Sequence, residues 1–221
     1  MQIVPAILTN NADDFVAQMH RLSPYYMRYS IDVLDGKYAP NVTLQPDQIG
    51  ALIREGKLTM DPECVYDFDL MVLDHQQYIK ELEELGKVIN IGFVFIHFST
   101  INKTSNISSE ELTIGISLDP QDQIDDLAKY KDLNTIPSIQ VMTITPGSQG
   151  QPFNKELLNK VYSLKSSGYE SPIFIDGGVN ETTIPAIMKH SYRPDFLCVG
   201  SYLSKAENIE KRIHELHTIL Q

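Results

Sequence analysis

Apolar runs alternate with amphipathic stretches along the whole of this 221-residue chain, and this alternation limits its fold more than any other feature. Runs such as Phe93-Val94-Phe95-Ile96 and Ile173-Phe174-Ile175 are apolar at successive positions. This pattern is typical of parallel strands that are buried on both faces. We therefore expect strands near residues 2–8, 27–33, 64–71, 92–98, 112–118, 138–144, 172–176 and 195–199.

Helical patterns separate these apolar runs. They lie near residues 12–22, 46–55, 75–86, 122–130, 154–167, 181–190 and 207–220. Because no Pro- or Gly-rich linker interrupts the alternation, we expect one domain over residues 1–221, built on a parallel sheet. At roughly 28 residues per strand and helix, an eight-stranded TIM barrel fits slightly better than an open doubly wound sheet.

The fourth strand–helix unit departs from this regular pattern. Polar residues occupy 102–106, and only a short helix start at 108–111 precedes the next apolar run. We expect the fourth helix to be short or missing.

Composition excludes several classes of protein. The hydrophobic content of 42% can bury a sizeable core, and the net charge of −11 disfavours non-specific binding to nucleic acid. No apolar run reaches the roughly 18 residues of a membrane helix. The start, Met1-Gln2-Ile3-Val4-Pro5, lacks the basic and apolar regions of a signal peptide, so we expect a cytoplasmic protein. The sequence leaves open whether it forms homo-oligomers.

Cysteine and histidine spacing gives no sign of a metal finger. Cys64 and Cys198 lie in separate apolar stretches without CxxC spacing, so we expect two buried free thiols. Five of the six histidines fall in helical patterns and are expected at the surface: His20, His75, His190, His214 and His217. His97 ends the fourth apolar run, where it either reaches a site or is a satisfied strand-end histidine.

Carboxylates follow three of the expected strands. In a barrel, the carboxyl ends of the strands meet on one face, so Asp32, Asp69 and Asp176 can converge there. Three close carboxylates must share a proton or hold a cation, and oxygen ligands favour Mg²⁺ or Mn²⁺ over Zn²⁺. Alternatively, each aspartate caps the loop that follows it, since Asp-Gly is an ordinary turn former.

Glycine-rich turns follow the last three expected strands. Glycines let backbone N–H groups approach an anion, and barrels often bind phosphate in these loops. The predicted phosphate site comprises Gly147, Ser148, Gln149, Gly150, Gly177, Gly178, Gly200 and Ser201. These glycines could instead serve tight turns alone.

Six segments, in order along the chain, carry a resemblance to a known family. They are Pro5–Leu8, Ile31–Asn41, Asp69–Val72, Met142–Phe153, Asp176–Asn180 and Gly200–Ser201. They resemble the PSIL, DVMDGxFVPN, HLMV, MTVxPGFGGQxF, DGGVN and GS motifs of the ribulose-phosphate 3-epimerase family.

This resemblance implies a TIM barrel that epimerises C3 of a ketopentose 5-phosphate. In that mechanism two aspartates, matched here by Asp32 and Asp176, act on opposite faces of the substrate. It further implies a divalent metal, held by two histidines and two aspartates, that stabilises the enediolate. The glycine turns match the family's phosphate cradle.

Three departures from the family pattern bear on its metal and substrate contacts. Ser30 and Asp69 stand at the positions of the two histidine ligands, and Ala6 replaces the serine of PSIL that contacts substrate. We therefore do not expect a Zn²⁺ site of the family type. Either Asp32, Asp69 and Asp176 bind Mg²⁺ or Mn²⁺, or the site works without metal on another phosphorylated ligand.

Three functional hypotheses follow. The first is an epimerase that uses Asp32 and Asp176, and the second is a sugar-phosphate-binding barrel that has lost the metal site. The third is a lyase or decarboxylase, which needs a lysine beside the carboxylates. Lys37 is the only lysine near the end of the second expected strand and lies beyond the turn, so this hypothesis ranks last.

Overall fold

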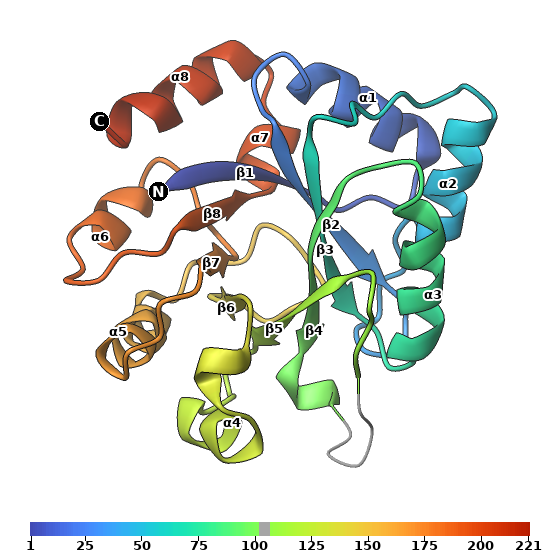
Figure 1. The fold of residues 1–221 in the computed structure, drawn as a ribbon. Helices are drawn as coiled ribbons and strands as arrows, with labels where there is room; N and C mark the ends of the chain where they lie inside the picture. The colour runs from blue at the N-terminus through green and yellow to red at the C-terminus, as the bar shows by residue number, and fades with distance from the viewer. Residues whose placement is uncertain (102–106) are drawn as a thin grey trace.

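The computed structural model describes residues 1–101 and 107–221 and forms a closed barrel of eight parallel strands. The strands follow one another around the barrel in sequence order, and the last pairs with the first (Figure 1). They are β1 (Gln2–Ile7), β2 (Arg28–Leu34), β3 (Val65–Met71), β4 (Ile91–His97), β5 (Thr113–Leu118), β6 (Ile139–Met142), β7 (Ile173–Asp176) and β8 (Phe196–Val199). All eight predicted strands are present, so the predicted TIM barrel is confirmed.

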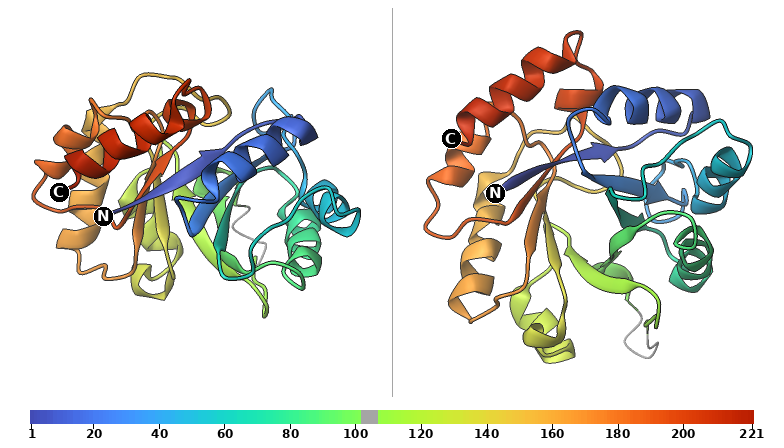
Figure 2. Two further views of the ribbon diagram at one scale, coloured as in Figure 1. Left: turned by 90° about the horizontal axis from the view of Figure 1, so that it is seen from above. Right: turned by 45° about the horizontal axis from the view of Figure 1, so that its top comes forward.

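Helices surround the strands on the outside of the barrel (Figure 2). They are α1 (Ala12–Leu22), α2 (Pro46–Arg54), α3 (His75–Leu85), α4 (Ile124–Tyr130), α5 (Leu158–Ser166), α6 (Ile184–Met188), α7 (Ser201–Ser204) and α8 (Ile209–Ile219). Short 3₁₀ turns lie at η1 (Phe98–Thr100), η2 (Leu133–Thr135) and η3 (Lys155–Leu157). The sequence did not predict α7. It also placed α6 too early, because the Asn180 side chain accepts from the Thr182 and Thr183 N–H groups and forms a turn first.

The fourth helix is missing from the described part of its unit, as predicted. Between β4 and β5 the described residues form only η1 and irregular chain. The expected helix start at 108–111 is wrong, because the Ser109 hydroxyl accepts from the Glu111 and Leu112 N–H groups and forms a turn. The polar segment 102–106 lies outside the described residues.

The amino end of the barrel is closed by a buried ion pair. Arg28, the first residue of β2, donates to both carboxylate oxygens of Asp67 on β3, at 2.6 and 2.7 Å. The guanidinium also lies 4.6 Å from the ring centre of Phe196 on β8. Val4, Ala6, Phe95, Phe174 and Cys198 pack together inside the barrel. Because aromatic rings and this ion pair fill the barrel interior at the amino end, a site inside the barrel is expected at the carboxyl ends of the strands.

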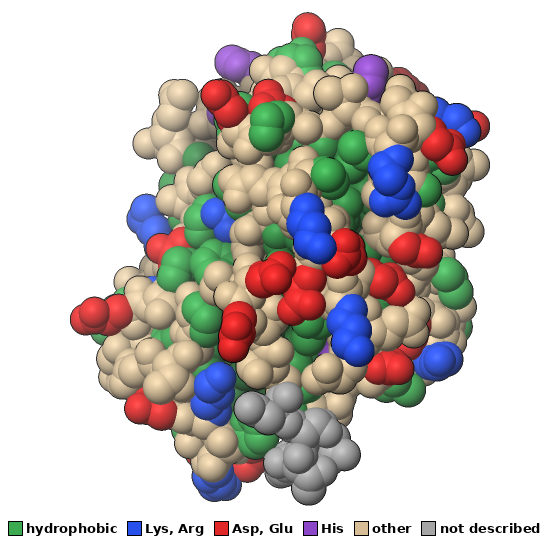
Figure 3. Space-filling view, turned by 45° about the vertical axis from the view of Figure 1, so that its right-hand side comes forward, with side chains coloured by type: hydrophobic (Ala, Val, Ile, Leu, Met, Phe, Trp, Pro, Cys, Tyr) green, Lys and Arg blue, Asp and Glu red, His purple; other side chains and the backbone are tan. Residues whose placement is uncertain are grey.

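Burial confirms the prediction for the cysteines and corrects one prediction for the histidines. Cys64 and Cys198 are buried and free, as expected. His75 corrects one surface prediction: it is buried at the first position of α3, and its Nε2 lies 2.9 Å from the Thr100 hydroxyl. In the described part of the chain, no helix is long and apolar enough to cross a membrane. One face of the molecule carries interspersed acidic and basic side chains (Figure 3).

Removing the arginine of the buried pair tests its role. Arg28→Met should lower the free energy of unfolding by about 3–5 kcal/mol, because it leaves the Asp67 carboxylate buried without its cation. Exposed Arg54→Met is the matched control and should change little. Urea unfolding measures both.

The pH dependence of that loss has a defined sign. Burial already raises the pKa of Asp67, while Arg28 opposes the rise. Without Arg28 the folded-state pKa rises further, so the carboxyl's contribution to stability is present below about pH 4 and lost as pH rises. The deficit of Arg28→Met relative to wild type should therefore shrink toward pH 4. A deficit independent of pH would contradict this account.

Candidate active site

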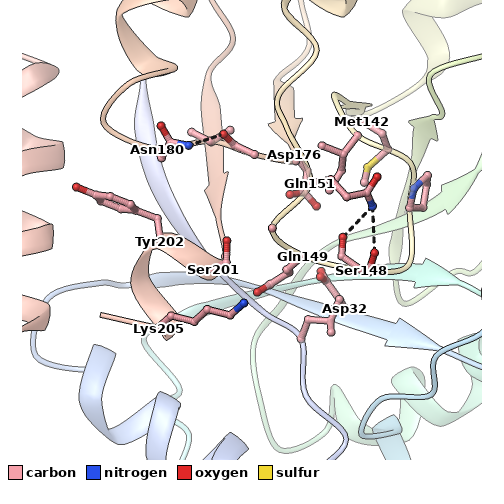
Figure 4. A pocket seen from close by; sticks show the side chains of 18 of the residues that line it. Asp32, Met142, Ser148, Gln149, Gln151, Asp176, Asn180, Ser201, Tyr202 and Lys205 are labelled. Atoms are coloured by element: carbon pink, nitrogen blue, oxygen red, sulfur yellow. Dashed lines mark hydrogen bonds between the residues drawn. The ribbon is translucent and has the colours of Figure 1, made fainter. Parts of the chain in front are cut away.

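A pocket of about 390 Å³ opens at the carboxyl ends of the strands. All of the predicted catalytic and phosphate-binding residues line it: Asp32, Gly147, Ser148, Gln149, Gly150, Asp176, Gly177, Gly178, Gly200 and Ser201. Apolar side chains, Leu8, Met71, Met142 and Ile144, form another part of its wall. Figure 4 shows Asp32 and Asp176 at the pocket, with Ser148, Gln149 and Ser201 around them. Among the predicted residues, the fold thus brings together positions that are up to 169 apart in the sequence, Asp32 and Ser201.

Strand register places the three aspartates. Asp32 on β2 pairs with Asp69 on β3, and Asp176 ends β7. One carboxylate oxygen from each lies within 4.8 Å of the others, and all three residues are buried. Ser30 lies two residues before Asp32 and pairs with Ala6 on β1, deeper in the barrel. The predicted convergence of the three carboxylates is therefore present.

Two buried threonines hold the backbone at the two candidate catalytic aspartates. The Thr43 hydroxyl donates to the Asp32 carbonyl at 2.7 Å, and the Thr143 hydroxyl donates to the Asp176 carbonyl at 2.8 Å. The Thr143 N–H donates to the same Asp176 carbonyl at 2.6 Å. These contacts fix both strand ends, and the sequence analysis did not identify either threonine.

Burial and mutual repulsion change the proton affinity of the aspartates. Burial raises the pKa of Asp32 well above its usual value, and the charges of Asp176 and Asp69 raise it further. Burial, followed by the charge of Asp69, raises the pKa of Asp176 to about 7. Near neutral pH, Asp32 and Asp176 therefore share a proton, and such a pair offers one acid and one base.

His97 balances the third aspartate. Its Nε2 lies 3.0 Å from Asp69 and its Nδ1 lies 2.6 Å from Asp119. Burial alone would lower the pKa of His97, but the charges of Asp69 and Asp119 outweigh burial and raise it to about 10. His97 is thus a buried imidazolium that donates to both carboxylates. The question that the sequence left open is answered: His97 reaches the aspartate cluster through Asp69.

A chain of hydrogen bonds supports His97 from the loop after β2. The Tyr38 and Ser99 hydroxyls donate to Asp119 Oδ2 at 2.6 and 2.5 Å. The Lys37 and Tyr38 N–H groups in turn donate to Asp35 Oδ1. The sequence analysis missed Asp119 and Tyr38. Asp119 follows the apolar run of β5, so the strand-end rule that found Asp32 could have found it as well.

Packing explains two of the glycines without any ligand. Gly177 and Gly178 have φ of +110° and +66°, where side chains are strained. A Cβ on Gly177 would come within 2.6 Å of Ile144, and one on Gly178 within 2.9 Å of the Phe153 nitrogen. The tight-turn alternative therefore accounts for this pair. Gly150 also has a positive φ, of +85°, but the space at its Cβ position is open, with Lys205 Nζ at 4.0 Å.

The sequence as a whole matches one protein family. A profile described as the ribulose-phosphate 3 epimerase family matches residues 2–204, nearly the whole chain. The chain belongs to this family. It is 28% identical over 193 residues to the ribulose-phosphate 3-epimerase of Methanocaldococcus jannaschii, covering 85% of this chain and 77% of that one. It is also 25% identical over 229 residues to that of Helicobacter pylori, covering 100% and 99%.

Solved structures support the fold of this family member. KGPDC from Streptococcus mutans, in complex with D-R5P, superposes with a TM-score of 0.70 at 13% identity. The match covers 99% of this chain and 96% of that one. At this identity the likeness concerns the barrel alone.

The residues present fit a hard divalent cation better than zinc. Asp32, Asp69 and Asp176 offer carboxylate oxygens, and Asp32 Oδ1 is buried with no hydrogen-bond partner among the described residues. Both ring nitrogens of His97 are engaged, so His97 offers no free ligand atom. Oxygen-only donors suit Mg²⁺ or Mn²⁺. This cluster of the epimerase-family chain could therefore hold a metal ion.

The shared proton makes a prediction about stability. The folded-state pKa of Asp176 lies near 7, above the unfolded value of about 3.9, so its contribution is present below pH 4 and lost as pH rises through 7. Asp176→Asn removes the ionisable group, and with it the free-energy cost of keeping an ionised carboxyl buried. With a chelator present to remove metal ions, the variant should be roughly 2–4 kcal/mol more stable than wild type at pH 8.5 and only about 1 kcal/mol more stable at pH 4.5.

Urea unfolding at both pH values measures the difference. Asp125→Asn, at an exposed position of α4, is the control and should show neither the gain nor its pH dependence. If Asp176→Asn were no more stable than wild type at pH 8.5, ionising the buried Asp176 carboxyl would not cost folding free energy, and this account would be wrong.

Proposed function

We propose that this chain epimerises C3 of a ketopentose 5-phosphate, with Asp32 and Asp176 as the acid–base pair. One observation carries the proposal: two buried carboxyls from opposite parts of the barrel line one pocket, and both have raised pKa values. Family membership and relatives named ribulose-phosphate 3-epimerase support the choice of reaction.

The proposed mechanism uses the single shared proton. The ionised aspartate removes the C3 proton from one face of the substrate, and the protonated aspartate returns a proton to the other face. Thr43 and Thr143 keep the two strand ends fixed during this exchange. Met71 and Met142 limit water around the reacting carbon and help to keep both pKa values raised.

The other groups bind or balance charge. The loop at 147–150 and the turns at Gly177, Gly178, Gly200 and Ser201 line the end of the pocket proposed for the phosphate. His97 holds Asp69 in place through its Nε2–H. A divalent cation held by Asp32, Asp69 and Asp176 would supply stabilisation of negative charge on the substrate oxygens next to C3.

Solvent exchange at C3 tests the reaction. Ribulose 5-phosphate should exchange its C3 proton with deuterium from the solvent, as followed by NMR with and without added Mn²⁺. Absence of exchange under every metal condition, from a folded protein, would rule out the proposed function.

Replacing each of the two aspartates should impair the reaction in a different way. Asp32→Asn and Asp176→Asn should each lower epimerisation by about 10²–10⁴-fold, the usual contribution of a positioned acid or base. Each variant keeps one base, so each should still exchange the C3 proton of one epimer, and the two variants should prefer opposite epimers. If both variants exchanged both epimers at wild-type rates, the assignment of the two bases would be wrong.

Metal choice gives a separate test. Mn²⁺ or Mg²⁺ should raise the unfolding midpoint of the wild type and should not raise that of Asp69→Asn or Asp176→Asn. Zn²⁺ should stabilise the wild type less than Mn²⁺ at equal free concentration, because the cluster lacks histidine and thiolate ligands. Stronger stabilisation by Zn²⁺ would contradict the oxygen-ligand site.

Ser30 favours a second candidate function. Its hydroxyl is buried and has no partner among the described residues, at the position of a family histidine. This change motivates a sugar-phosphate-binding barrel without turnover, which predicts phosphate-ester binding by calorimetry and unchanged affinity in Asp32→Asn. A strong loss of binding in that variant would count against this candidate. The lyase hypothesis has less support, since it relied on Lys37. This lysine is exposed and does not line the pocket, where the lysine present is Lys205.

A further inference from the structure

Lys205 lies at the phosphate end of the pocket. It follows α7, and it is one of two basic side chains that line the pocket, with Arg212. Its Nζ lies 4.0 Å from the position that a Cβ on Gly150 would occupy, and no other described atom outside residues 149–151 lies within that distance. In Figure 4 its amine points into the pocket, toward the loop that carries Gln149.

The charge of Lys205 is free, whereas that of Arg212 is offset. Arg212 lies 3.3 Å from Glu215 and 3.8 Å from Glu181, and its guanidinium stacks 4.4 Å from the ring centre of Tyr202. Lys205 forms no ion pair with any residue that the structure describes. In a chain with a net charge of −11, this leaves Lys205 as the cation in the pocket best able to meet an anion.

Gln149 covers part of the backbone that would otherwise bind an anion. A Cβ on Gly200 would overlap the Gln149 side-chain amide, so this amide lies directly against Gly200. Its Nε2 also donates to the Ala6 carbonyl at 3.3 Å, which holds the side chain across the pocket wall. An anion that approached the Gly200 backbone would have to displace this side chain. The glycine turns alone therefore expose fewer backbone N–H groups to an anion than the number of glycines suggests.

We propose that Lys205 is the principal anion-binding side chain of this pocket and selects ligands with a terminal phosphate dianion. The ammonium provides a point charge beside the exposed Gly150 turn. The identity of the bound phosphate ester rests on the proposed function, whereas the role of Lys205 in anion binding does not.

Titration with inorganic phosphate tests this role without any catalytic step. Calorimetry at pH 7.5 and constant ionic strength should show phosphate binding about tenfold weaker in Lys205→Met than in wild type, because a charge-assisted contact is lost. Lys205→Arg should keep most of the affinity. Lys131→Met is the matched control, since Lys131 is exposed, lies at the end of α4 and does not line the pocket. With ribulose 5-phosphate, Lys205→Met should raise KM and leave kcat unchanged.

Gln149→Gly provides the second variant. It should tighten phosphate binding, because it uncovers the Gly200 backbone, and it should reduce the loss caused by Lys205→Met in the double variant. Equal phosphate affinity in wild type and Lys205→Met, or no phosphate binding by wild type, would overturn the inference. Lys205-dependent binding without C3 exchange would refute only the epimerase proposal, whereas exchange with an unaffected Lys205→Met would refute only the role of Lys205.

Discussion

The rest of the pocket depends on the two hydrogen bonds of His97. Asp32, Asp69 and Asp176 approach one another at the end of the barrel, away from water, where like charges repel strongly. The His97 imidazolium supplies a positive charge to Asp69 and takes a second carboxylate, Asp119, on its other nitrogen. Asp69 is further held by the Gln140 amide, 2.9 Å from its Oδ2. With Asp69 balanced and fixed, the proton shared by the other two aspartates has no competing site.

Local signals in the sequence were enough to predict the barrel and much of the candidate site. Alternating apolar and amphipathic segments specify a strand–helix repeat, and an aspartate at the end of an apolar run identifies Asp32 and Asp176. Network residues escaped this reasoning because their partners are distant in sequence. Tyr38 and Asp119 are 81 positions apart, and His97 and Asp69 are 28 apart. The short α7 escaped for a different reason, since four residues are too few to show a helical period.

Three of the departures from the family pattern lie together on one side of the barrel. Ala6 and Ser30 are register partners on β1 and β2, so they form a single altered patch in space, and Asp69 lies on the adjacent strand. On the other side, β7 ends in Asp176, and Thr143 after β6 holds its backbone. These three departures thus surround Asp32, one of the two matched aspartates, whereas Asp176 lies on the far side of the pocket from them. Asp69 in place of a histidine also accounts for the link to His97, since a carboxylate accepts the Nε2–H bond.

The two ends of the barrel interior satisfy their polar groups in different ways. At the amino end, Asp67 accepts from Arg28 twice and from the Phe93 N–H, so its oxygens are paired within the fold. Between this ion pair and the pocket, Ser30 Oγ, Asp32 Oδ1 and Gln140 Oε1 are buried and have no partner among the described residues. These are three of the six such side-chain atoms in the described chain, and all three lie on barrel strands around Asp69. Buried polar groups are normally paired, and exceptions that gather in one place mark a functional site. The barrel interior is therefore satisfied by paired charge at its amino end and keeps unpaired polar groups toward the end where the candidate pocket opens.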